Sequence, residues 1–239
     1  MMSPFLTAFA TADGFGKLIF LGLFVLSIIS WVILVHKFLL LRKIEAGSTE
    51  FASFIKQQKE HLFRLKEHHM PKTDVQHPFT TIYFSLKQKT QDFLAKNQYF
   101  KTSSDKDPVY LSKTDVEAVQ TDVNASISRE GKMLEKNLFM LSTIVTLAPF
   151  LGLLGTVWGI LVAFNELQGG ASLGSSTALL GGLSTALTTT VLGLLIAIPA
   201  LIGYNYLKNA IRSYEKEMED FGGYLTAQVE LQYRQVDLK

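Results

Sequence analysis

The distribution of charge restricts the fold of this chain more than any other sequence feature. Between Asn137 and Leu207 the only charged residue is Glu166. A water-soluble domain carries charged side chains at far shorter intervals, so this pattern favours segments that cross a membrane. A further apolar run follows Lys17. Only helices and closed barrels satisfy their backbone hydrogen bonds in lipid, and these runs have the length of helices. The sequence therefore predicts an all-α integral membrane protein.

Three transmembrane helices are expected, at 17–41, 137–164 and 177–207. Their orientation follows from the basic residues, which collect on the cytoplasmic side of a membrane. Segment 42–136 holds 16 of the 23 Lys and Arg residues and the tail 208–239 holds five, whereas 1–16 and 165–176 hold none. We therefore expect the N-terminus (1–16) and the turn (165–176) to lie on the outer side, and a helical domain (42–136) and the C-terminal helix (208–239) to be cytoplasmic.

The cytoplasmic part has the pattern of long helices. Apolar residues at helical spacing predict one helix over 42–68, and a second is expected over 79–99. The polar stretch 101–108 resembles a linker. The run Thr114–Glu117 has the form of a capping box and predicts a helix start. No breaker follows it, so this helix is expected to enter the second span as one rod, and the tail to continue the third span.

Several classes of function are disfavoured by composition. A net charge of +2 gives no reason to expect nucleic acid as a partner, and the absence of cysteine excludes thiolate ligands. No nucleophile and base stand together in a pattern of catalysis, so no enzyme and no cofactor are expected. Four histidines lack the spacing of a metal site, and none is predicted; they are His61, His68, His69 and His77.

The second span carries small residues one helical turn apart. Gly152, Gly155 and Gly159 lie on one face, where small side chains let helices approach closely in lipid. Simple helix packing explains these glycines as well as a functional role does, and we expect their face to mediate contacts between copies of the chain. Pro149 in this span and Pro199 in the third each free a carbonyl one turn back, which adds hydrogen-bonding capacity within the membrane.

The third span is rich in hydroxyl groups, with five between Ser184 and Thr190. Thr189 and Thr190 share a face with small residues, and such a face can hold water and line a polar path. The alternative is that each hydroxyl bonds to a carbonyl of its own helix. Neither this span nor the second has a deep acidic or basic residue, although proton paths commonly use one. Any titrating group must then come from another chain.

These spans resemble a known family. The run Gly152–Ile160, with the sequence GLLGTVWGI, is similar to the signature of the MotA/TolQ/ExbB proton-channel family. The run from Gly193 to Ala200, followed by Tyr204 and Asn205, resembles the signature that comes next in that family. The first span and the approach Ala148–Phe150 resemble the TolQ branch more than the ExbB branch.

The resemblance implies a bacterial inner membrane, with a periplasmic N-terminus (1–16) and a periplasmic turn (165–176). It also implies a homopentamer around the paired helices of a single-span TolR/ExbD-like partner, with proton flow transmitted as force through a TolA/TonB-like protein. It places pore threonines at Thr156 and Thr190. Family members usually carry a Glu where this chain has Thr185. The ion path is therefore expected to comprise Thr156, Thr185, Thr189 and Thr190, and to depend on the partner's acid.

Other functions fit the same sequence. An ExbB-like subunit that energises nutrient uptake would need the same chemistry, and a non-conducting membrane scaffold would need only the packing residues. A flagellar stator is disfavoured, since that branch has four spans.

Overall fold

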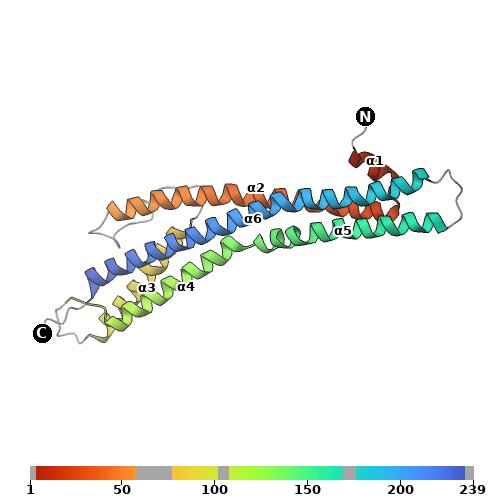
Figure 1. Ribbon diagram of the computed structural model, residues 1–239. Coiled ribbons are helices and arrows are strands. Elements are labelled where there is room, and N and C mark those ends of the chain that lie inside the picture. Colours follow the sequence, from red (N-terminus) through yellow and green to blue (C-terminus); the bar gives the residue numbers. More distant parts are fainter. Residues whose placement is uncertain (1–3, 58–76, 102–107, 169–175, 235–239) are drawn as a thin grey trace. The chain divides into compact units, whose positions relative to one another are not determined.

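The structure, a computed structural model, describes residues 4–57, 77–101, 108–168 and 176–234 (Figure 1). The described residues form six α-helices. An isolated bridge between Leu111 and Arg234 is the only β-type pairing among them. The helices are α1 (Pro4–Thr11), α2 (Gly14–Gln57), α3 (Pro78–Phe100), α4 (Lys113–Glu135), α5 (Leu138–Gln168) and α6 (Ser176–Tyr233).

Three helical stretches are long and apolar enough to cross a membrane. They are Gly14–Gln57, Lys113–Asn165 and Leu180–Tyr233. The expected all-α class with three candidate spans is thus confirmed. The expected continuity of the third span with the tail is also confirmed, because α6 runs without interruption to Tyr233.

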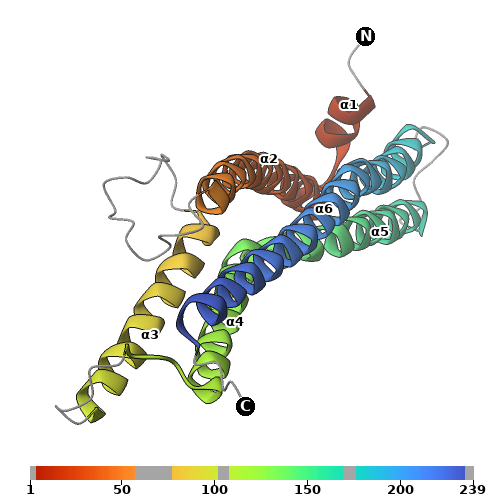
Figure 2. The ribbon, with the colours of Figure 1, turned by 90° about the vertical axis from the view of Figure 1, so that its left-hand side faces the viewer.

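The chain divides into two compact units. The first, which we call the span unit, comprises Met1–Phe38 and Asn137–Lys208. In it, α2, α5 and α6 lie side by side, as both views of the ribbon show (Figures 1 and 2). Their shared core consists of Ile19, Leu23, Ile144, Ala148, Ile196 and Ala197. Helix α1 packs onto α2 through Ala8, which forms a small cluster with Phe20 of α2 and with Ala12, the residue that follows α1.

The outside of the span unit is apolar. Phe24, Phe150 and Ile202 each expose about two thirds of their surface, at 65%, 68% and 66%. Large apolar side chains at this density on a surface mark contact with lipid or with another protein chain rather than with water.

The second unit, which we call the polar unit, comprises Leu39–Lys136 and Asn209–Lys239. Its core is aromatic: the rings of Phe79 and Phe221 stack with centroids 4.5 Å apart, and Phe51 contacts Tyr83 and Phe221 edge-on. The hydroxyls of Ser48 and Tyr214 are hydrogen-bonded inside this core. Helices α3 and α4 are joined by a hydrogen bond in which Ser85 Oγ donates to Asp122 Oδ2 over 2.7 Å.

The structure corrects two expectations about helix ends. The predicted single rod is wrong, because α4 ends at Glu135 and Asn137 has a φ of 72° before α5 begins. Asparagine is one of the few residues that adopt this left-handed conformation readily, so it breaks the helix without Gly or Pro. The helix start is also not capped by Thr114. Ser112 caps α4, since its hydroxyl accepts from the Asp115 N–H and the Asp115 carboxylate accepts from the Ser112 N–H.

Other expected boundaries shift. The helix predicted over 42–68 is the continuation of α2 and is described only to Gln57, so its remainder lies outside the described residues. Most of the predicted linker, 102–107, and part of the predicted turn, 169–175, also lie outside them. Helix α5 extends to Gln168, four residues past the expected end of the second span. Pro78 stands in the first turn of α3, where proline is well tolerated.

Candidate functional site

The small residues of the second span lie against α6 of the same chain. A Cβ atom added at Gly152 would meet the carbonyl oxygen of Thr189 at 2.9 Å and the Cα of Thr190 at 3.0 Å. One added at Gly159 would lie 2.8 Å from the Cβ of Ala186. The contacts of 2.9 Å and 2.8 Å are shorter than real Cβ contacts, and the one of 3.0 Å is tighter than most, so glycine is needed at both positions for α5 and α6 to approach this closely.

Gly155 leaves the space that the side chain of Thr189 occupies. A Cβ atom there would fall 2.7 Å from the Cβ of Thr189 and even closer to its hydroxyl. The face formed by Gly152, Gly155 and Gly159 is therefore filled by α6 within one chain. From the sequence we inferred that these glycines mediate contacts between subunits. In the structure their neighbours are residues of α6 in the same chain.

Three of the four threonines expected on an ion path converge on one carbonyl. Thr156 Oγ1 and Thr190 Oγ1 each lie 3.0 Å from the Gly152 carbonyl oxygen, in donor geometry. Their hydroxyls also hydrogen-bond each other. Thr189 Oγ1 lies 3.4 Å from the same carbonyl and 2.7 Å from that of Ala186. The close approach at Gly152 is what brings these hydroxyls from two helices together.

This cluster is chemically versatile. A hydroxyl has one proton to donate and two lone pairs with which to accept. Thr156 and Thr190 have two protons to share between the Gly152 carbonyl and each other, so lone pairs remain for a water molecule or a cation. Hydroxyls that bond only to their own helix would lack this coupling, and the pair bridges α5 and α6. Pro149 lies in α5 and Pro199 in α6, within the same candidate spans.

Thr185 lies apart from the other three. Its Oγ1 is 2.9 Å from the Gly181 carbonyl oxygen, 3.2 Å from that of Ala8, and 3.5 Å from Thr11 Oγ1. The first of these bonds is within α6, and the other two reach α1. Thr185 exposes only 6% of its surface. It therefore lies at the contact between α1 and α6.

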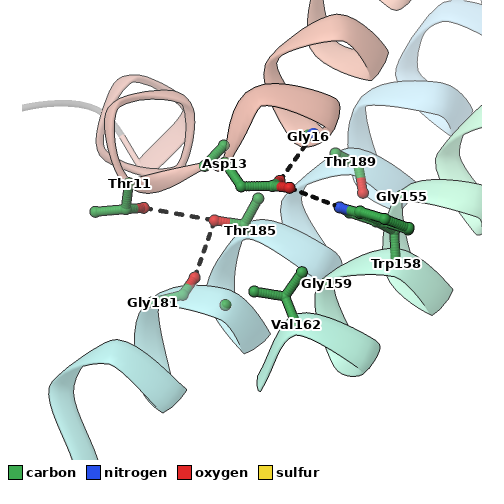
Figure 3. A pocket seen from close by; sticks show the side chains of 12 residues that line it. Thr11, Asp13, Gly16, Gly155, Trp158, Gly159, Val162, Gly181, Thr185 and Thr189 are labelled. Carbon is green, nitrogen blue, oxygen red and sulfur yellow. Dashed lines mark hydrogen bonds between the residues drawn. The ribbon is translucent and has the colours of Figure 1, made fainter. Parts of the chain in front are cut away.

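Thr185 and Thr189 both line a cavity of about 300 Å³, which Figure 3 shows from close by. The corner between α1 and α2 forms one wall, and α5 and α6 form the others. The cavity is lined by Thr11, Ala12, Asp13, Gly16, Gly155, Trp158, Gly159, Val162, Gly181, Gly182, Thr185 and Thr189.

The carboxylate of Asp13, at the corner between α1 and α2, lines the cavity. Asp13 Oδ2 accepts a hydrogen bond of 2.9 Å from Trp158 Nε1, and Oδ1 accepts one of 2.9 Å from the Gly16 N–H (Figure 3). The Phe15 ring lies against the Trp158 ring, with centroids 4.5 Å apart. Burial acts to raise the pKa of Asp13, but the bonds from Trp158, Gly16 and Phe15 outweigh it and hold the pKa below its usual value. Asp13 is thus ionised at neutral pH.

Sequence reasoning missed Asp13 and Trp158. Asp13 is the only acidic residue among the first 44, and it directly precedes a long apolar helix, where Asp is a common cap. That signal was available, but nothing in the sequence pairs it with Trp158, which is 145 residues away. Among the described residues, no group of three His, Cys, Asp or Glu side chains could hold a metal ion.

Comparison with known proteins identifies the family. Residues 86–220 match the model of the MotA/TolQ/ExbB proton channel family. Over 113 residues the chain is 34% identical to the Tol-Pal system protein TolQ of Haemophilus influenzae, an alignment that covers 47% of this chain and 48% of that protein. It is also 34% identical over 131 residues to a putative biopolymer transport protein, ExbB-like 1, of Synechocystis, which covers 54% of this chain and 50% of that one.

A third relative is the TolQ of Pseudomonas aeruginosa, 40% identical over 92 residues, which are 38% of either chain. The chain thus spans about half the length, or less, of these relatives, whose names divide between TolQ and ExbB. The matched model describes proton channels rather than enzymes, and it includes the second candidate span and most of the third. This chain, a multi-pass membrane protein with three candidate spans, belongs to the MotA/TolQ/ExbB proton channel family.

Proposed function

We propose that this chain is the channel subunit of a TolQ-like complex that converts the proton motive force into mechanical work on the cell envelope. The observation that carries the proposal is the hydroxyl pair of Thr156 and Thr190, which bridges two candidate spans at the Gly152 carbonyl. A pair that can donate and accept at once can hold water beside an acid and assist its protonation and deprotonation.

The acid belongs to a partner in this proposal. Between Asn137 and Leu207 the chain has no acidic residue except Glu166, near the end of α5. A single-span TolR/ExbD-like partner would supply the titrating group, and its paired helices would occupy the centre of a homopentamer of this chain. A TolA/TonB-like protein would receive the force. The apolar exterior of the span unit supports contact with lipid and with neighbouring subunits.

The proposed topology places segment 1–16 and the 165–176 turn in the periplasm, and 42–136 and 208–239 in the cytoplasm. The one-sided distribution of basic residues supports it. The chain has no cysteine, so cysteines introduced at Ser172 and at Ser213 can be labelled one at a time. They should react from opposite faces of the membrane, and labelling from the same face would contradict the topology.

An ExbB-like role in nutrient uptake is the second candidate, and the ExbB name of one relative favours it. A deletion strain distinguishes the two roles. Loss of envelope integrity and delayed division would indicate the TolQ-like role, whereas loss of energised uptake across the outer membrane would indicate the ExbB-like one. A structural scaffold would conduct no ions even with its partner present.

The decisive experiment measures proton flux into proteoliposomes that contain the chain and its co-purified partner. The double change Thr156→Val and Thr190→Val keeps side-chain shape but removes both hydroxyls. We expect the complex to assemble with unchanged mass, because hydrogen bonds between membrane helices average only about 0.6 kcal/mol, and we expect flux to be lost.

Thr188→Val is the matched control. Thr188 lies two residues from Thr190, on nearly the opposite side of α6, and its hydroxyl donates to the Ser184 carbonyl of its own helix over 2.7 Å. This variant should conduct like the wild type. An assembled double variant that conducts normally would refute the ion-path role and leave helix packing as the explanation for these threonines.

A further inference from the structure

The cavity beside α1 carries the strongest unassigned chemistry in the span unit. Asp13 and Glu166 are the only acidic residues in the sequence segments that form this unit. Asp13 places its carboxylate in the cavity wall, next to the indole of Trp158 (Figure 3). The same cavity is lined by the side chains of Thr185 and Thr189, which expose 6% and 0% of their surface. A negative charge and buried hydroxyls thus face one space.

This cavity is connected to the threonine pair through a single residue. Thr189 lines the cavity, and its Oγ1 lies 3.4 Å from the Gly152 carbonyl oxygen. That carbonyl oxygen is also the acceptor for Thr156 and Thr190. The cavity therefore offers a cation or a proton two kinds of oxygen ligand, the Asp13 carboxylate and the Thr189 hydroxyl, and the second shares the Gly152 carbonyl with the pair.

Helix capping alone does not account for the charge of Asp13. The bond from the Gly16 N–H to Asp13 is the one a cap makes at the start of a helix. Asparagine and serine cap helices about as well as aspartate, but each has one acceptor oxygen, whereas the two carboxylate oxygens of Asp13 accept separately from Gly16 and from Trp158. The second oxygen thus serves the contact with α5, and the ionised carboxylate also adds an electrostatic field that acts on mobile cations.

We propose that the cavity lined by Asp13, Trp158, Thr185 and Thr189 is the entrance through which cations reach the Thr156–Thr190 pair, and that the Asp13 carboxylate is the fixed charge that concentrates them there. This inference rests on the proposed ion path and on the proposed periplasmic position of the N-terminus. It assigns Asp13 a positioning role and gives the chain a charge of its own at the entrance, separate from the partner's acid.

The expected effect of the charge is moderate and depends on salt. A unit negative charge about 6 Å from a cation in water raises the local cation concentration about threefold. Salt screens this attraction, with a Debye length of about 30 Å at 0.01 M and about 3 Å at 1 M. A purely structural role for Asp13 would show no such dependence.

The test compares proton flux in proteoliposomes of the complex at about 0.01 M and about 1 M choline chloride. Asp13→Asn removes the charge and leaves one acceptor oxygen for two N–H donors, so one of the two hydrogen bonds is lost as well. Trp158→Phe is the matched control, since it removes the indole N–H donor and keeps an aromatic ring and the charge. The Thr156→Val and Thr190→Val double variant is included in every series.

We expect Asp13→Asn to conduct about threefold less than the wild type at low salt and equally at high salt, and Trp158→Phe to keep the salt dependence of the wild type. Equal flux of Asp13→Asn and wild type at low salt would overturn the inference. So would a reduction by the same factor at both salt concentrations, because that result indicates a structural role. Either result refutes only the entrance if the wild type conducts protons and the threonine double variant abolishes that flux. A wild type that conducts nothing would refute the proposed function and the entrance with it.

Discussion

The contact between α5 and α6 at Gly152 gives the sharpest prediction of how packing and function are coupled. In Gly152→Ala, the new Cβ would lie 2.9 Å from the Thr189 carbonyl oxygen and 3.0 Å from the Thr190 Cα. Ordinary contact begins at 3.4 Å, and both atoms belong to the backbone of α6. No side chain can rotate out of the way, so the helices must move apart by about 0.5 Å.

The energetic cost can be isolated with a control. Overpacking of this kind costs about 1–3 kcal/mol, and an alanine in place of glycine within a helix recovers about 0.5–1 kcal/mol. Gly22 lies in α2 of the same unit, and a Cβ there would meet no atom within 4 Å. Gly22→Ala should therefore gain about 0.5–1 kcal/mol of helix propensity, with no overpacking cost. The difference in unfolding free energy between the two variants then equals the overpacking term, about 1–3 kcal/mol.

The assay is unfolding of the detergent-solubilised protein by SDS, followed by circular dichroism. Gly152→Ala should unfold at lower SDS than the wild type, and Gly22→Ala at equal or higher SDS. The same 0.5 Å movement would lengthen the bond from Thr190 Oγ1 to the Gly152 carbonyl from 3.0 Å to about 3.5 Å, at the limit of hydrogen bonding, so Gly152→Ala should also conduct less. Equal stability of the two variants would refute this account of the α5–α6 contact.

Three predictions concern residues at helix ends. Asn137→Ala should lower the unfolding free energy by about 1 kcal/mol, because alanine is strained at a φ of 72°, whereas Asn137→Gly should preserve it; thermal denaturation distinguishes the two. Ser112→Ala should lower the unfolding free energy by about 1 kcal/mol, because α4 loses the N-cap bond from the Asp115 N–H. Thr121→Ala, at an exposed position of α4, should change it little, and thermal denaturation measures both. Burial lowers the pKa of His77 from 6.5, against the attraction of Glu50, so its contribution to stability is full above pH 6.5 and falls as the pH decreases below it. The melting temperature of His77→Gln should therefore fall less between pH 7.5 and 5.5 than that of the wild type, and an equal fall would contradict the burial effect.

The candidate site could be predicted only in part. The sequence places Thr156 and Thr190 on helices with small-residue faces, and the close contact of those helices follows from Gly152 and Gly155. Their convergence on the Gly152 carbonyl depends on the relative register of α5 and α6, which no local pattern specifies. Thr185 was expected beside the others. Its hydroxyl instead contacts the Ala8 carbonyl and the Thr11 hydroxyl of α1, and the packing of α1 on α6 is not specified by any local pattern.

The sequence by itself determined which segments can cross a membrane, because the free energy of placing charge in lipid depends on local composition and length. It also determined that the tail continues the third span, since no glycine or proline lies between Tyr204 and Phe221. The left-handed break at Asn137 and the cap at Ser112 depend on one or two backbone angles, which several sequences allow. The approach of Asp13 to Trp158 was decided only by the tertiary structure, because a hydrogen bond across 145 residues requires three helices to be packed before its two partners meet.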